Sequence, residues 1–141
     1  MERYLLDTNI LVFMVSGESD NISKDVQHIL YDLNNQLYTS SVAVAELLQL
    51  YRLNKIQQKE KFKNASELVA VLEADFYITI LPFSKEHIST LAKLNIAAGH
   101  NDPSDHSIIS HAITEKLTLV SSDKQFENYT KQKLKFAFNK R

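Results

Sequence analysis

The sequence predicts an α/β fold in which a mainly parallel sheet is flanked by helices. Short apolar runs of strand length alternate with longer segments whose apolar residues recur at helical spacing. The runs end at residues that stop a strand, such as Asp7 and Pro82. Strands that alternate with helices form βα units, which make the strands parallel and place the helices on the faces of the sheet.

The predicted strands are short and mostly apolar. The run 4–6 stops at Asp7, and the β-branched run before Pro82 stops at that proline. We expect the last strand at the edge of the sheet, with Phe136 and Phe138 packed on helices rather than stacked on bases. The predicted strands are residues 4–6, 37–40, 77–81, 117–121 and 134–138.

Helices are predicted between these strands. Ser23 and Ser84 suit N-cap positions, and the segment 42–53 is too rich in Ala and Leu to be a strand. Three helices have a predicted inward face: Val26, Ile29, Leu30 and Leu33 in residues 23–34; Phe62, Ala65, Val69 and Leu72 in a helix ending near Asp75; and Ile88, Leu91, Ala92 and Asn95 after Ser84. A further helix starts at Asp102 and Pro103.

Composition limits the class of protein. The chain has 141 residues, 44% apolar and 23% charged, which predicts one globular domain over residues 1–141. Its 16 basic and 17 acidic residues give a net charge of −1, which by itself argues against a chain that mainly coats nucleic acid. Two isolated glycines and no cysteine exclude phosphate-binding Gly-rich loops, disulfides and thiolate metal sites.

The chain shows no targeting or membrane signal. Charges at Glu2, Arg3 and Asp7 come too early for a secretory signal peptide, and no apolar run approaches the length of a membrane span. The absence of cysteine suits a reducing compartment. We therefore expect a soluble cytoplasmic protein that does not contact a membrane.

Acidic residues stand where two of the predicted strands end. Asp7 follows the strand 4–6, and Asp123 follows the strand 117–121. The carboxyl ends of parallel strands meet at one edge of a sheet, where the working cleft of open α/β proteins lies. Because aspartate is also a common turn and N-cap residue, a purely structural role for each alone remains an alternative.

Two further acids are predicted to point inward from helices. Glu46 has apolar neighbours on both sides, and an unpaired carboxylate buried there costs on the order of several kcal/mol. A partly exposed Glu46 at the edge of the apolar face is the alternative. Asp105 lies three, four and seven residues before apolar positions, so it continues the inward stripe. Asp102, followed by Pro103, is favoured as an N-cap.

Four acids are therefore expected at one edge of the sheet. Two bare carboxylates about 4 Å apart repel by roughly 4 kcal/mol at an effective dielectric near 20. Such a cluster must take up protons or bind a cation. Oxygen ligands without thiolates favour Mg²⁺ or Mn²⁺. The chemistry that such a site suits is metal-assisted hydrolysis of a phosphodiester.

At these residues the sequence resembles the PIN-domain nucleases, specifically the VapC-type toxins of toxin–antitoxin modules. The resemblance spans essentially the whole chain. Each motif alone is weak, but their order in a chain of this size is specific. The motifs are residues 5–9 (LLDTN), 41–47 (SVAVAEL), 100–105 (HNDPSD) and 119–123 (LVSSD).

The resemblance implies a fold, an activity and partners. The fold would be a PIN-like three-layer sandwich, and the activity Mg²⁺- or Mn²⁺-dependent endoribonuclease cleavage of RNA. The implied partners are a small antitoxin protein and a second copy of the chain in a homodimer. The implied catalytic and metal-binding residues are Asp7, Glu46, Asp105 and Asp123, supported by Asp102, Thr8, Asn9 and Ser121.

The sequence also departs from the family pattern. Ser104 stands where the family commonly has an aromatic residue, and His106 where arginine is frequent. Ser121 replaces a frequent threonine but keeps the hydroxyl. None of these changes removes an implied metal ligand, so they bear on how the RNA is held.

The histidines near the acids are expected to have secondary roles. His106 is a candidate for contacting a substrate phosphate, and His100 for supporting Asp102. His111 lies six residues after Asp105, off the inward stripe, so we expect it to be exposed or at an interface.

Basic residues gather in two segments although the net charge is small. Residues 52–63 hold five basic residues against one acid, and residues 124–141 hold six against one. They form solvated faces or hold the RNA backbone beside an acidic cleft, with Arg52 and Lys124 as candidate contacts.

Other functions remain open at this stage. A stand-alone RNA-processing PIN nuclease would share the site, whereas a silent RNA- or protein-binding PIN module would bind no metal. An aspartyl-phosphate phosphatase would also place an acid after the first strand. Its second acid, two residues on, is Asn9 here, which removes the general acid.

Overall fold

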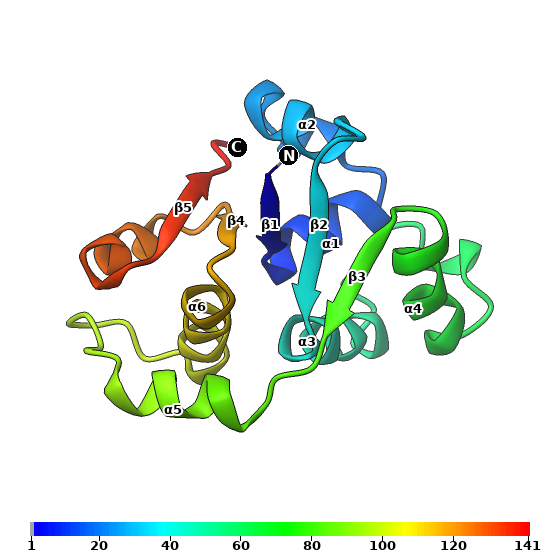
Figure 1. The fold of residues 1–141 in the computed structure, drawn as a ribbon. Coiled ribbons are helices and arrows are strands. Elements are labelled where there is room, and N and C mark those ends of the chain that lie inside the picture. Colours follow the sequence, from blue (N-terminus) through cyan, green and yellow to red (C-terminus); the bar gives the residue numbers. More distant parts are fainter. Residues whose placement is uncertain (1) are drawn as a thin grey trace.

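The computed structural model describes residues 2–141 and contains one five-stranded sheet. The strand order is β3-β2-β1-β4-β5, and every neighbouring pair is parallel, as predicted (Figure 1). The predicted last strand lies at one edge. The strands are β1 (Arg3–Leu6), β2 (Gln36–Ser40), β3 (Ile78–Leu81), β4 (Thr118–Ser121) and β5 (Lys135–Phe138).

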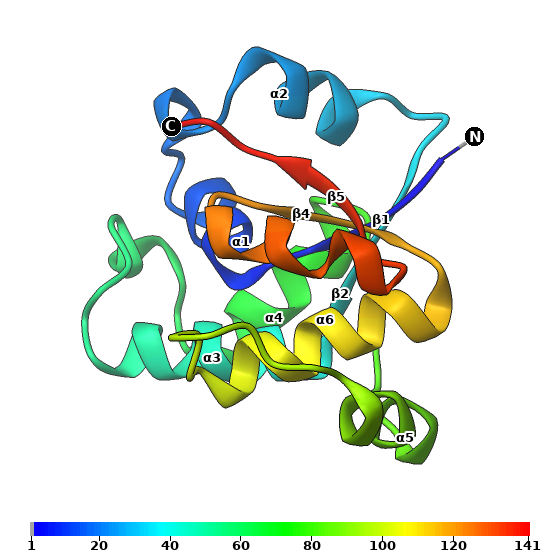
Figure 2. The same ribbon diagram turned by 90° about the vertical axis from the view of Figure 1, so that its left-hand side faces the viewer.

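Helices connect the strands in the order expected for βα units. Helix α2 lies at one end of the molecule with both termini, and α5 lies at the opposite end (Figures 1 and 2). The helices are α1 (Thr8–Val15), α2 (Lys24–Tyr31), α3 (Ser41–Arg52), α4 (Ala65–Ala74), α5 (Lys85–Lys93) and α6 (Pro103–Glu115), with 3₁₀ turns at Ser19–Asn21, Lys59–Lys61 and Lys124–Gln132.

The order of the strands reverses between β1 and β4. The chain proceeds outward from β1 through β2 to β3, then crosses back to β4 and continues to β5. Leu6 lies opposite Val120, and the backbone N–H of Asp7 donates to the Val120 carbonyl at 3.0 Å. The residues that follow β1 and β4 are therefore neighbours at the switch point, where open parallel sheets form their clefts.

The central strands are buried on both faces. Leu5 and Leu6 in β1 and Leu119 and Val120 in β4 are fully buried. This is why these strands are continuous apolar runs rather than alternating ones, because helices cover both faces of a parallel sheet. The rigid core holds the ends of β1 and β4 in place.

Several helix predictions need correction. Helix α2 ends at Tyr31, so Leu33 lies outside it and is 93% exposed. Phe62 is buried but precedes α4, which begins only at Ala65 after an Asn64 N-cap. The strand β3 starts at Ile78, because Tyr77 has a left-handed φ of 55°.

The inward face of α5 was also predicted wrongly. Ile88 is 53% exposed, Ala92 is exposed, and Asn95 lies beyond the end of the helix. The buried residue of this helix is His87, whose side chain pairs with Glu115 of α6. The contact between His87 and Glu115 sets which side of α5 faces α6, and the spacing of apolar residues does not reveal a polar contact of this kind.

Among residues 2–141, no helix is both long and apolar enough to span a bilayer.

Candidate active site

A cleft of about 350 Å³ opens at the carboxyl ends of β1 and β4. Asp7 reaches it from the end of β1, Glu46 from α3, and Asp123 from the turn after β4. Asp102 and Asp105 reach it from the first turn of α6. The structure therefore brings together the four acids singled out in the sequence, with Asp102 beside them. The complete lining is Asp7, Thr8, Asn9, Val12, Phe13, Glu46, Leu50, Asp102, Asp105, Asp123 and Arg141.

Asp7 is the most buried of these acids, with 4% of its surface exposed. Its Oδ1 accepts from the Thr8 backbone N–H at 2.8 Å, and its Oδ2 accepts from the Ser121 hydroxyl at 2.6 Å and the Asn9 amide at 3.1 Å. Burial nevertheless raises the pKa of Asp7 to about 7, and the charges of Asp105 and Glu46 add to the rise. Near neutral pH this carboxyl is thus divided between its acid and its charged form.

Asn9 and Ser121 connect the end of β1 with the turn after β4. The Asn9 amide also donates to the Ser121 hydroxyl at 3.0 Å, while its carbonyl accepts from the Ser122 backbone N–H at 3.1 Å. Ser121 in turn accepts from the backbone N–H of Asp123 at 3.0 Å. These hydrogen bonds hold Asp7 and the Asp123 backbone in a fixed relation across the switch point.

Glu46 and Asp105 face the same cleft and are partly buried. Thr8 donates its hydroxyl to Glu46 Oε1 at 3.0 Å. Burial raises the pKa of Glu46, and the charges of Asp102 and Asp105 raise it further. Burial and the charge of Asp102 also raise the pKa of Asp105, against the lowering effect of its hydrogen bond to His100. The charged form of each acid is therefore destabilised by burial and by the negative charges of its neighbours.

Three of the acids also cap helices, so the structural and functional interpretations are compatible. Asp7 caps α1, and Asp102 caps α6 by accepting from the Ser104 backbone N–H at 2.9 Å. Asp123 caps the 3₁₀ turn that follows β4, where its Oδ1 accepts from Gln125 N–H at 2.9 Å. In Asp102 and Asp123 the other carboxylate oxygen has no hydrogen bond to residues 2–141, so it is available to an ion.

The donor set fits a hard divalent cation. Carboxylate oxygens dominate the cleft lining, and such oxygens are the ligands that Mg²⁺ and Mn²⁺ prefer. One cluster also offers a nitrogen, because donor atoms of His100, Asp105 and Asp123 lie within 4.8 Å of one another. Burial and mutual repulsion raise the pKa values of Asp7, Glu46 and Asp105, and a cation bound among them would favour their charged forms. These residues would hold the ion.

The histidines lie differently from the prediction. His100 is 2% exposed and pairs through Nε2 with Asp105 Oδ2 at 3.0 Å, not with Asp102. Its Nδ1 is 2.7 Å from the hydroxyl of the buried Tyr129. His106 is half-buried, with Nε2 2.8 Å from the His100 carbonyl oxygen. His111 is fully buried within the chain, which overturns the prediction that it is exposed or at an interface.

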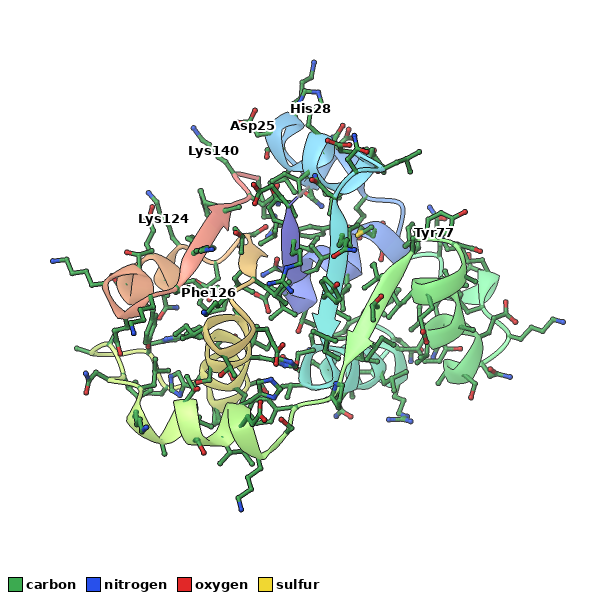
Figure 3. All side chains as sticks on the ribbon, in the orientation of Figure 1. Asp25, His28, Tyr77, Lys124, Phe126 and Lys140 are labelled. Atoms are coloured by element: carbon green, nitrogen blue, oxygen red, sulfur yellow. The ribbon has the colours of Figure 1, made fainter. Side chains whose placement is uncertain are left out.

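One basic residue lines the cleft, and it belongs to the basic segment 124–141. Arg141 lines the cleft, with its guanidinium 5.0 Å from the centre of the Phe13 ring. No sequence signal singled out this arginine, because only the path of β5 brings it back beside α1. Arg52 and Lys124 are exposed. Figure 3 shows Lys124 and Lys140 pointing outward on the β5 side.

Removing the Ser121 hydroxyl tests whether its hydrogen bond to Asp7 supports metal binding. We expect Ser121→Ala to weaken Mn²⁺ binding about 10- to 100-fold, because Asp7 loses its shortest hydrogen bond. Isothermal titration with Mn²⁺ measures the change. Ser16→Ala is the matched control: Ser16 is equally buried, but its hydroxyl has no hydrogen-bond partner among residues 2–141. Equal Mn²⁺ affinity in both variants would contradict the role given to Ser121.

Fold and cleft together define a class: parallel α/β proteins with a carboxylate-lined cleft at the switch point. Within that class, the PIN-domain family model matches residues 4–132, and the chain belongs to the PIN-domain family. The fold prediction of a PIN-like α/β sandwich is thus confirmed.

Solved structures with a similar fold include VapBC complexes. VapBC2 from Rickettsia felis bound to a promoter DNA fragment is 25% identical, with a TM-score of 0.69 over 97% of this chain and 98% of that chain. VapBC-1 from nontypeable Haemophilus influenzae is 20% identical, with a TM-score of 0.63 over 96% and 97%. VapBC-5 from Mycobacterium tuberculosis is 17% identical, with a TM-score of 0.63 over 98% and 99%. The last two likenesses concern the fold alone. Comparison with curated protein sequences finds no significant match.

Proposed function

We propose that this PIN-domain protein is a VapC-like endoribonuclease that requires Mg²⁺ or Mn²⁺ and acts in the cytoplasm as the toxin of a toxin–antitoxin pair. The observation that carries the proposal is the gathering of acids around the buried Asp7, whose pKa lies near 7. The likeness to the VapBC2 complex supports the toxin assignment and the antitoxin partner, and the homodimer is proposed from the family resemblance alone.

The chain's own residues prepare the cleft for a phosphodiester. A bound divalent cation would supply an activated water and stabilise the leaving oxygen. Asp7, Glu46, Asp105 and Asp123 would hold that ion. Thr8, Asn9 and Ser121 keep carboxylates aimed into the cleft through their hydrogen bonds.

Arg141 would hold a substrate phosphate at the cleft. Its guanidinium lines the same cavity as the acids, and arginine binds phosphate oxygens through paired hydrogen bonds. Exposed lysines and Arg52 on the segment 52–63 would extend this contact along the RNA backbone. An arginine beside the acidic cleft thus suits a phosphodiester substrate and metal-assisted cleavage.

The test is RNA cleavage by the purified chain. We expect cleavage with Mg²⁺ or Mn²⁺, none with EDTA, and at least a hundredfold loss in Glu46→Gln, because one carboxylate and its charge leave the cleft. Glu73→Gln, an exposed substitution on α4, is the control and should cleave as the parent does. Gel analysis of a labelled RNA pool gives the rates.

The same preparation separates the alternatives. Full cleavage by Glu46→Gln would overturn the metal-nuclease proposal, and absence of Mn²⁺ binding would favour a silent binding module. A small protein that co-purifies from the native host supports the toxin–antitoxin assignment. A nuclease that purifies alone from that host would instead be a stand-alone processing enzyme.

A further inference from the structure

A second group of metal-ligating side chains lies between α5 and α6, outside the acidic cleft. His87 of α5 and His111 and Glu115 of α6 each offer a donor atom, and these atoms lie within 4.8 Å of one another. His111 and Glu115 are four residues apart on one helix, so they share a face. Asp105 lies six residues before His111 and ten before Glu115, about 9 and 15 Å along the helix axis, so the two sites are separate.

His111 has a ring nitrogen that residues 2–141 leave without a partner. Its side chain is fully buried, and its Nδ1 is 2.8 Å from the Ser40 hydroxyl. Its Nε2 is buried with no hydrogen-bond partner. Burying a polar atom without a partner is costly, and native proteins seldom do so without a reason. Because Nδ1 is occupied by Ser40, Nε2 is the atom left to bind an ion.

His87 and Glu115 complete the group. His87 Nε2 lies 2.7 Å from Glu115 Oε2, and the two imidazole ring centres of His87 and His111 are 3.9 Å apart. The Glu115 side chain is 37% exposed, whereas that of His87 is 5% exposed. An ion can therefore enter from solvent beside Glu115. Phe83 packs on both rings, with ring centres 5.5 and 5.8 Å away.

The proton on His87 can be accommodated when an ion is bound. Without an ion, Nδ1 accepts from the Ser84 backbone N–H at 2.8 Å, so the ring proton sits on Nε2 and is donated to Glu115. With an ion on Nε2, the proton sits on Nδ1 and faces the Ser84 N–H, so the contact between these two nitrogens has to open. A small rotation of the ring then directs the Nδ1 proton to the Ser84 hydroxyl, 3.0 Å away, and the partly exposed Ser84 N–H takes a water as its partner.

We propose that His87, His111 and Glu115 form a binding site for a divalent transition-metal ion of the Zn²⁺ type, with water as the fourth ligand. Two imidazole nitrogens and one carboxylate are a donor set that zinc accepts and that Mg²⁺ does not favour. The ion clamps α5 to α6. It takes no part in the proposed nuclease reaction.

Zinc binding to the full-length chain tests the proposal. The protein is stripped with EDTA, and Zn²⁺ is titrated in excess Mg²⁺ into the parent and into Glu115→Gln, because Zn²⁺ also competes for the carboxylates and His100 of the acidic cleft. We expect one equivalent of Zn²⁺ to bind in the parent beyond what the cleft takes up, and this binding to raise the melting temperature. Co²⁺ in its place should give the visible absorption of a tetrahedral site with nitrogen ligands.

Matched variants locate the binding. Glu115→Gln keeps an oxygen for the His87 hydrogen bond but loses the charge, so it should fold and bind Zn²⁺ at least tenfold more weakly. Glu86→Gln, on an exposed position of α5, should bind as the parent does. Because His111→Gln changes a fully buried residue and can unfold the chain, Glu115→Gln is the deciding variant, with its fold checked by circular dichroism in EDTA.

Two results would overturn the proposal: no Zn²⁺-dependent rise in melting temperature, or equal affinity in Glu115→Gln and the parent. Asp7→Asn should keep the zinc site intact. Since no measurement here involves RNA, failure of this proposal is distinct from failure of the nuclease proposal.

Discussion

Replacing Asp7 by asparagine should make the metal-free protein more stable at neutral and alkaline pH. Burial raises the pKa of Asp7 from 3.8 to about 7, so the folded chain binds this proton more tightly than the unfolded chain does. The favourable contribution is complete below pH 4 and is lost as the pH rises to 7. Asparagine keeps the side-chain shape and cannot ionise, so it avoids that loss of on the order of 4 kcal/mol above pH 7. Its NH₂ group cannot accept from the Asn9 amide and the Ser121 hydroxyl, which costs about 1–3 kcal/mol at every pH and leaves the net gain positive only near neutral pH and above.

Urea unfolding in EDTA between pH 4 and pH 8 measures this effect. The difference in unfolding free energy between Asp7→Asn and the parent should increase with pH and level off above pH 7. Asp75→Asn, on an exposed position outside the cleft, is the control for replacing an aspartate by asparagine. A flat difference for Asp7→Asn would show that Asp7 titrates normally. With Mg²⁺ present only the parent should gain stability, because the variant lacks a proposed ligand.

His100→Ala should lower both stability and metal affinity. The ring links the Tyr129 hydroxyl at 2.7 Å with Asp105 Oδ2 at 3.0 Å. Its removal leaves a cavity and takes a partner from the buried Tyr129, which together cost about 3 kcal/mol. Asp105 also loses the group that orients it, so Mn²⁺ binding should weaken about 10- to 100-fold.

Urea unfolding and Mn²⁺ titration check the two effects separately. Tyr129→Phe keeps the ring at that position and removes only its hydroxyl, so it should cost less stability and give an intermediate Mn²⁺ affinity. His28→Ala, exposed on α2 (Figure 3), is the control and should change neither quantity. Unchanged Mn²⁺ affinity in His100→Ala would mean that Asp105 keeps its orientation without this histidine.

The strand ends explain why the acids could be found before the structure. Asp7 and Asp123 follow apolar runs too short for helices, and parallel strands bring such ends to one edge. Asp102 and Asp105 belong to a helix start marked by Pro103, whose rules are local. Local sequence patterns therefore predicted which acids gather at the carboxyl edge of the sheet, although they could not give the distances between these acids or their pKa values.

The histidines show where local patterns fail. His111 lies off the apolar stripe by spacing, yet it is fully buried because α6 is covered by α5 on one side and by Ser40, at the start of α3, on another. Likewise, His87 replaces Ile88 as the inward residue of α5 because it pairs with Glu115. Both contacts join residues far apart in the chain.

The sequence by itself determined the alternation of strands and helices, the caps and the acids at the strand ends, because each depends on residues within one or two turns. Only the tertiary structure decided that Asp7 is buried with its pKa near 7, that His100 pairs with Asp105, and that Arg141 returns to the cleft. Burial and pairing depend on elements that lie far apart in the chain. Asp7 and Ser121, which form a hydrogen bond, are more than a hundred residues apart. The net charge of −1 thus conceals a cleft lined by five acids and one arginine.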